Sequence, residues 1–108
     1  MIVVTSPTVP GKTIIQTMGL VSGNTIRARH VGKDVLAALR NLVGGEIMEY
    51  AKLLAESREQ AVDRMIAQAE KLDANAIVSM QFSTSVIMGS AAEMMAYGTA
   101  VMVEDNRQ

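Results

Sequence analysis

The sequence contains no cysteine, and this absence limits the chemistry open to the chain. Disulfide bonds, thiolate metal ligands and thiol nucleophiles are all excluded, and a cysteine-free chain suits a reducing compartment. The only histidine is His30. Because a zinc site usually takes several thiolate or imidazole ligands, we do not expect a single chain to hold one.

No excess of either charge and no long apolar run is present. Lys and Arg number 10 against 11 Asp and Glu, so no basic surface is expected to attract nucleic acid or an anionic membrane. No segment approaches the ~20 apolar residues that a membrane-spanning helix needs. The first residues also lack the basic stretch and apolar core of a signal peptide. We therefore predict a cytoplasmic protein that has neither nucleic acid nor membrane as a partner.

Aromatic residues are scarce, with one Phe, two Tyr and no Trp, although 49% of the chain is hydrophobic. The core must therefore be built from aliphatic side chains and the nine methionines, whose flexible thioethers fill irregular gaps. A chain of 108 residues has the size of one ordinary domain, so residues 1–108 are predicted to form a single domain.

Hydrophobic periodicity predicts one long strand and two helices in the first two thirds of the chain. Residues 12–29 are rich in β-branched residues, and Gly19 and Gly23 mark a bend, a bulge or a close backbone approach. Apolar residues at helical spacing predict a short helix over 32–43 that stops at a Gly44-Gly45 hinge, and a long helix over 46–72. The long helix, about 40 Å in length, exceeds what one small sheet can cover.

Two apolar strands are predicted after the long helix. In the first, Ala76, Val78, Met80 and Phe82 alternate with polar residues, so one face is expected to be exposed to water. The strand over 94–104 is apolar on both faces, and helices on one side of a sheet can cover only one of them. We predict an α+β fold of two layers, in which one long and one short helix pack on a small antiparallel sheet. A second copy of the chain is expected to cover the remaining face.

Four separated sequence blocks resemble the YbjQ-like family in order and spacing: GLVSG (19–23), VGGE (43–46) with a Tyr after it, LDANAI (72–77) and YGTAV (97–101). The chain departs from the family at Asp73, where the family usually has Gly. The resemblance covers nearly the whole chain. It implies a subunit distantly like that of dodecin, assembled into a homopentamer, and a heavy-metal-binding label without an established activity.

Few residues are candidates for a binding site. His30 and Asp34 stand four apart, a spacing that places both on one face of a helix, and are weak candidates for a metal site. Met88, Met94 and Met95 are an alternative for Cu(I), which favours thioether ligands. Tyr50 and Tyr97 join an apolar ring to a polar hydroxyl, so they could line an interface pocket or simply lie in the core.

No set of nucleophile, base and orienting group is recognisable, so catalysis is not expected. We predict a homo-oligomeric structural or binding module that carries no cofactor. The alternative is a carrier of a small ligand or a heavy metal, with a site shared between subunits.

Overall fold

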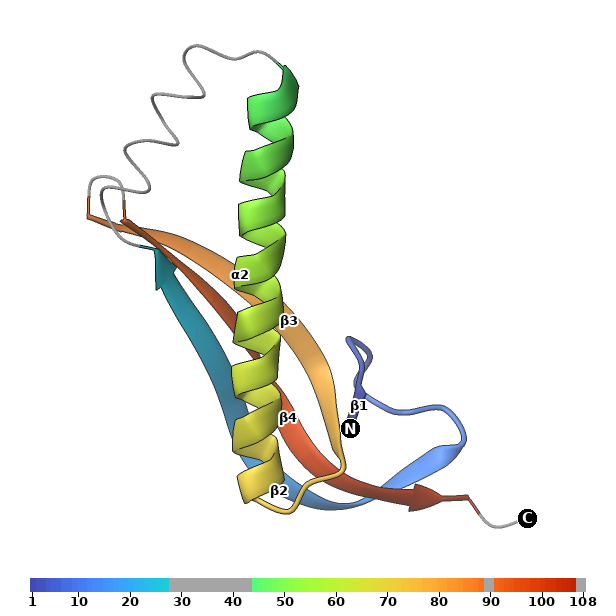
Figure 1. Cartoon of the computed structure of the whole chain (residues 1–108). Coiled ribbons are helices and arrows are strands. Elements are labelled where there is room, and N and C mark those ends of the chain that lie inside the picture. Colours follow the sequence, from blue (N-terminus) through green and yellow to red (C-terminus); the bar gives the residue numbers. More distant parts are fainter. Residues whose placement is uncertain (28–43, 89–90, 107–108) are drawn as a thin grey trace.

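The computed structural model of the chain describes residues 1–27, 44–88 and 91–106. In these ranges the elements are β1 (Ile2–Val3), β2 (Lys12–Arg27), α2 (Gly44–Lys71), β3 (Ala76–Met88) and β4 (Ala91–Asp105). The strands form one sheet in the order β1-β3-β4-β2, and α2 crosses one of its faces (Figure 1). The predicted two-layer α+β fold is confirmed.

The prediction of an antiparallel sheet was wrong for one strand. β4 pairs antiparallel with both β2 and β3, but β1 runs parallel to β3, with Ile2 opposite Ala76. An extended piece over residues 2–5 can be predicted from the sequence, but the parallel pairing of its two strand residues with β3 joins segments far apart in the chain. The predicted short helix over 32–43 lies outside the described residues.

α2 matches the predicted long helix except at its start. Gly44 and Gly45 form its first turn rather than preceding it as a hinge. Its 28 residues give a length of about 42 Å, and its first turns extend past the end of the sheet (Figure 1). No helix in the described part of the chain is long and apolar enough to span a membrane.

α2 ends at Lys71, one residue before the predicted end at 72, and Asp73 just beyond it adopts a left-handed conformation with φ 62°. Asn75 then fixes the helix end to the sheet. Its side-chain amide donates to the carbonyl oxygen of Val103 at 2.9 Å, and its Oδ1 accepts from the Val103 N–H at 2.8 Å. The LDANAI block thus combines a helix stop with a clamp on β4.

Small residues let α2 lie close to the sheet. The core between the two layers contains Val21, Ala61, Met65, Ala69, Ala74, Ile77, Met80, Ala96 and Ala100. A Cβ added to Gly23 would stand 2.2 Å from the carbonyl oxygen of Ala61 and 2.4 Å from the backbone nitrogen of Met65. Of the alternatives predicted for the two glycines, Gly23 is a site of close backbone approach, and Gly19 lies at a bulge, because the β2–β4 register shifts between Thr17 and Gly19.

A second bulge changes which face the residues of β3 occupy. The register against β4 shifts between Val78 and Gln81, and Ser79 has φ 54°. Ile77 and Met80 consequently share the core under α2, whereas Ala76 and Val78 belong to the core on the opposite face. The predicted common face of Ala76, Val78, Met80 and Phe82 was wrong, since one extra residue reverses the alternation.

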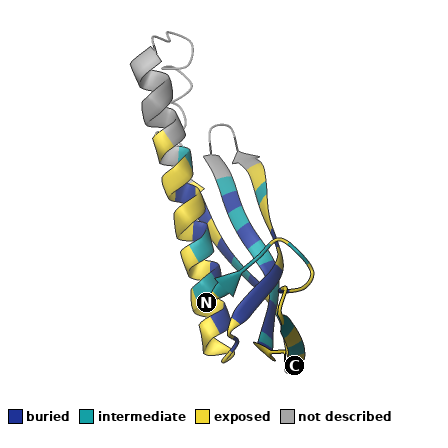
Figure 2. Ribbon diagram, turned by 90° about the vertical axis from the view of Figure 1, so that its right-hand side faces the viewer, coloured by how far each residue is buried: buried dark blue, intermediate teal, exposed yellow. Residues whose placement is uncertain are grey.

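The face of the sheet away from α2, here called the outer face, is covered at one end by the chain itself. Val101 and Val103 of β4 pack there with Val9 and with three partly buried residues, Ile2 and Val4 of the N-terminal segment and Ile14 of β2. Figure 2 shows this segment lying across the lower part of the sheet. Both faces of β4 are apolar as predicted, but at this end no second copy is needed to cover the outer one.

Candidate functional site

An open groove runs between α2 and β3. It has a volume of about 660 Å³ and is lined by Ala55, Arg58, Glu59, Val62, Asp63 and Phe82. The groove exists because α2 lies over β2 and β4 and scarcely touches β3. Phe82, the only phenylalanine in the chain, is consequently left 45% exposed on the side of the sheet that the helix should cover.

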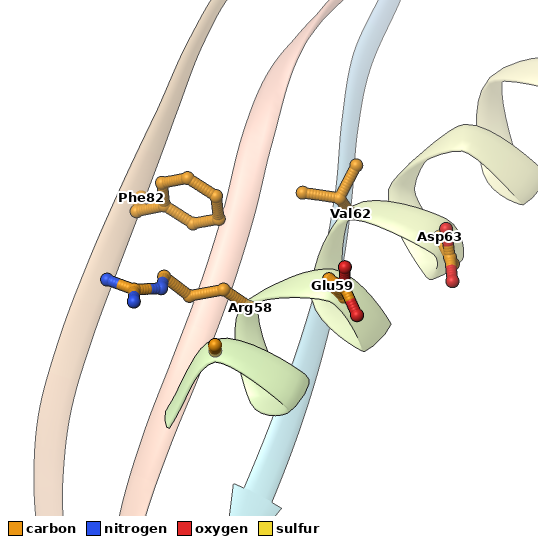
Figure 3. A pocket seen from close by; sticks show the side chains of 6 residues that line it. Arg58, Glu59, Val62, Asp63 and Phe82 are labelled. Atoms are coloured by element: carbon orange, nitrogen blue, oxygen red, sulfur yellow. The ribbon is translucent and has the colours of Figure 1, made fainter. Parts of the chain in front are cut away.

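The groove is apolar at its base and charged along its helical wall. The ring of Phe82 faces Val62, and the side chain of Arg58 extends from α2 toward β3 beside that ring (Figure 3). Glu59 and Asp63 lie on the solvent side of the same wall. An open apolar trench beside a strand is suited to an extended polypeptide rather than to an enclosed small molecule.

On the side away from β4, β3 has no backbone partner beside this groove among the residues that the structure describes. Met80 donates its N–H to the carbonyl oxygen of Val4, and among the described residues the N-terminal segment bonds no farther along β3. Backbone groups of successive residues point alternately to the two neighbouring strands. Phe82 and Thr84 therefore direct their N–H and C=O groups outward, to an open sheet edge.

The middle of the opposite sheet edge, formed by β2, is bonded to side chains of α2. Gln68 accepts a hydrogen bond from the backbone N–H of Ser22 at 2.7 Å, and Arg64 donates to the carbonyl oxygen of Asn24. Both backbone groups lie on the free side of β2. Covering an edge with helix side chains prevents it from pairing with another chain.

Tyr97, one of the predicted pocket residues, lies half-buried on the outer face, where its hydroxyl donates to Oε1 of Gln81 at 2.9 Å. Tyr50 belongs to α2, and its side chain is outside the described set. A pocket that the two tyrosines form between copies stays a prediction.

The outer face also carries exposed aliphatic side chains. Leu20 is 75% exposed and Ile26 is 61% exposed. Leu20 points away from the helix, because the next residue of β2 is buried beneath α2. Asn24 donates to Glu93 at 2.9 Å between them. This part of the face lies beyond the cover that the N-terminal segment provides.

The predicted metal candidates are not assembled in the described residues. His30 and Asp34 fall outside them. Thr84 donates to the sulfur of Met94 at 3.2 Å beneath the helix, whereas Met95 points to the outer face, so these two thioethers cannot bind one ion in a single chain. No group of three or more His, Asp or Glu side chains that could hold a metal occurs in the part of the chain that the structure describes.

Comparison with known proteins supplies the family. Residues 1–104 match a family described as "Putative heavy-metal-binding" (YbjQ). The chain belongs to the YbjQ-like family. A UPF0145 protein of Dehalococcoides mccartyi is 56% identical over 104 residues, covering 96% of this chain and 100% of its own. A UPF0145 protein of Methanosarcina acetivorans is 50% identical over 103 residues, covering 95% and 97%.

A solved structure supports the fold of this YbjQ-like chain. A protein of unknown function from Pediococcus pentosaceus, assigned to the DUF74 family, superposes with a TM-score of 0.64 over 96% of this chain and 98% of its own. At 17% sequence identity the likeness concerns the fold alone.

Sequence reasoning missed the groove and its base, Phe82. That residue was assigned to the same face as Ala76, and only the bulge at Ser79 turns it toward α2. A usable signal was present, because the 13 residues of β3 include no charged residue and no proline. A strand of that composition at a sheet edge is poorly protected against pairing with another chain.

Proposed function

We propose that this YbjQ-like protein is a self-assembling binding module, with an interface formed by the uncovered part of the outer face. The observation that carries the proposal is the exposure of Leu20 and Ile26, at 75% and 61%, on a face where Met95 and Tyr97 are only half-buried. Exposed aliphatic side chains next to half-buried apolar ones, with polar side chains around them, are typical of surfaces that bind other proteins.

A second copy of the chain is the proposed partner, and a homopentamer is the assembly that the YbjQ resemblance implies. A cyclic assembly uses different surfaces on its two sides, so a ring would bury the outer face of one subunit against another part of its neighbour. A dodecin-like arrangement and a cytoplasmic location belong to the same proposal. Catalysis has no part in it.

Light scattering and native mass spectrometry test this proposal. We expect a mass that is a multiple of 11.6 kDa at micromolar concentration. The substitution Leu20→Lys should shift the population toward single subunits, while Thr17→Lys, at an exposed position on the same strand outside the aliphatic patch, should leave the mass unchanged. A wild-type particle of one subunit would refute the proposal.

The family description supports a second candidate, a carrier whose ligand site is shared between subunits. Native mass spectrometry of chelator-free, tag-free protein addresses this candidate directly, since a retained metal ion or small molecule adds its own mass to the assembly. A bound ion at fewer than one per subunit would place it between chains rather than within one.

A further inference from the structure

The geometry points to an edge-to-edge contact between two copies of this chain, in which β3 pairs antiparallel with β3 of the partner. This inference rests on the proposed self-association and adds a specific interface to it. The contact uses the outward backbone groups of Phe82 and Thr84 and the groove beside them. It is separate from the outer face.

The first argument is the state of the edge. Beyond Met80, the N-terminal segment makes no backbone hydrogen bond to β3, so within the described part of the chain nothing pairs with the outward backbone groups of Phe82 and Thr84. Sheets usually protect such edges with charged side chains, proline or a covering helix. β3 has no charged residue and no proline, and α2 lies over the other strands.

The second argument concerns symmetry. If both edges of the sheet were open, copies could add head to tail without limit. The edge of β2 is blocked in its middle by Gln68 and Arg64, which occupy the backbone groups of Ser22 and Asn24. The middle of the β2 edge is therefore unavailable for pairing, and the matching free stretch on another copy is its own β3 edge. Such a contact is two-fold symmetric, and it gives an even number of subunits or joins two rings.

The third argument is the groove. Phe82 and Thr84 both face α2, as the groove lining and the bond from Thr84 to Met94 establish. A strand added beside β3 extends the sheet beneath the open trench, and its own helix-side residues lie next to Phe82. In an antiparallel β3 pair those residues are again Phe82 and Thr84 of the partner. The added strand thus covers a ring that is 45% exposed in the single chain.

Amide hydrogen exchange of the purified protein tests the contact residue by residue. The amides of Ser83 and Ser85 bond to β4 in any case, so they serve as internal controls. At high protein concentration we expect the amides of Phe82 and Thr84 to exchange on the order of 100-fold more slowly than in a dilute sample. Fast exchange of both in a protein that is oligomeric by light scattering would overturn the inference while leaving the proposed function intact.

Cysteine cross-linking tests the two-fold symmetry, and the absence of natural cysteine makes it clean. Ser83 and Ser85 occupy positions that do not bond across the open edge, where opposed Cα atoms of an antiparallel pair stand about 4.5 Å apart. A disulfide accepts a Cα separation of about 4.4–6.8 Å. Depending on register, mild oxidation should link Ser83→Cys to itself, Ser85→Cys to itself, or the two variants to each other when mixed.

The matched control is Gln60→Cys, an exposed position on α2, which should stay unlinked under the same conditions. If none of the three β3 combinations links more than this control in an oligomeric sample, the edge contact is wrong. If light scattering finds only single subunits, the proposed self-association fails with it. Linking confined to the β3 positions supports the two-fold pairing.

Discussion

Replacing Gly23 by alanine tests the central packing of the fold, the approach of α2 to β2. A Cβ at this position would stand 2.2 Å from the carbonyl oxygen of Ala61, 2.4 Å from the backbone nitrogen of Met65 and 2.7 Å from Cβ of Arg64. Carbon and oxygen atoms in contact normally stand at about 3.3 Å or more. The helix would therefore have to move away by about 1 Å along its middle turns.

The cost should be large because the obstructing atoms are mainly backbone. Overpacking of a core costs about 1–3 kcal/mol and sometimes more. A side chain could rotate away, but here the whole helix must shift, and its bonds from Gln68 and Arg64 to β2 resist this. We expect a loss of at least about 3 kcal/mol in the free energy of unfolding. For a domain of this size, that lowers the Tm by about 12 °C or more.

Urea unfolding followed by far-UV circular dichroism measures this loss, with all variants at one subunit concentration because association would shift the midpoint. Gly19→Ala is the informative comparison. Gly19 has φ 131° but no atom within 4 Å of an added Cβ, so its substitution reports backbone strain without a clash. Gly23 lacks a positive φ, so its substitution reports the clash alone. A Gly23→Ala midpoint within error of the wild type would refute the packing argument.

Three further predictions follow from other parts of the molecule. Gly98→Val should lower the Tm more than Ser83→Val in scanning calorimetry. A Cβ at Gly98 would meet Cγ2 of Ile77 at 2.7 Å and the carbonyl oxygen of Val78 at 3.0 Å. Equal Tm shifts for the two variants would contradict the assignment of faces. The side-chain hydrogen bond from Lys12 and the positive charge of Lys12 lower the pKa of Asp105. This carboxylate therefore stabilises the fold above its unfolded pKa and loses that effect as the pH falls through its folded pKa. A carboxyl resonance of Asp105 that titrates no lower in the wild type than in Lys12→Met would argue against the pair. Tight binding of Zn²⁺ or Cd²⁺ at one ion per chain is not expected from a sequence with no cysteine and one histidine, and titration calorimetry that found a submicromolar site lost in His30→Ala would reverse this expectation.

Much of the fold could be predicted because its signals are local. An apolar stripe at helical spacing predicts the long helix. Just after its end stands Asp73, one of the few non-glycine residue types that tolerate a left-handed conformation. The two apolar faces of β4 and the roles of Gly19 and Gly23 were likewise readable. Each of these features depends on residues that are neighbours in sequence.

The features that were missed depend on single residues or on distant contacts. Ser79 takes a left-handed conformation that no residue preference would assign to a serine in a strand, and this reverses the facing of the residues that follow it, Phe82 included. The parallel pairing of Ile2 with Ala76 joins segments far apart in the chain. The cover that this segment gives to Val101 and Val103 could not be predicted without that pairing.

The candidate site was less predictable than the fold for the same reason. Tyr97 was selected for its chemistry, and the structure places it on the outer face with Gln81 as partner. Phe82 was treated as an ordinary strand residue, although its surroundings are decided by the bulge at Ser79 and by the position of α2 over the other strands. Neither influence can be read from the residues next to it.

The position of α2 explains both why the edge of β2 is protected and why Phe82 of β3 is exposed. Because Gly23 admits α2 close to β2, the side chains of Arg64 and Gln68 reach the edge of that strand and close it. The same displacement toward β2 leaves β3 without cover, so Phe82 stays exposed beside an edge that has no charge to protect it. The bonded edge of β2 and the exposure of Phe82 beside β3 are therefore two results of one helix position, and a substitution such as Gly23→Ala that pushes α2 off β2 should also loosen the bonds from Arg64 and Gln68 to that edge.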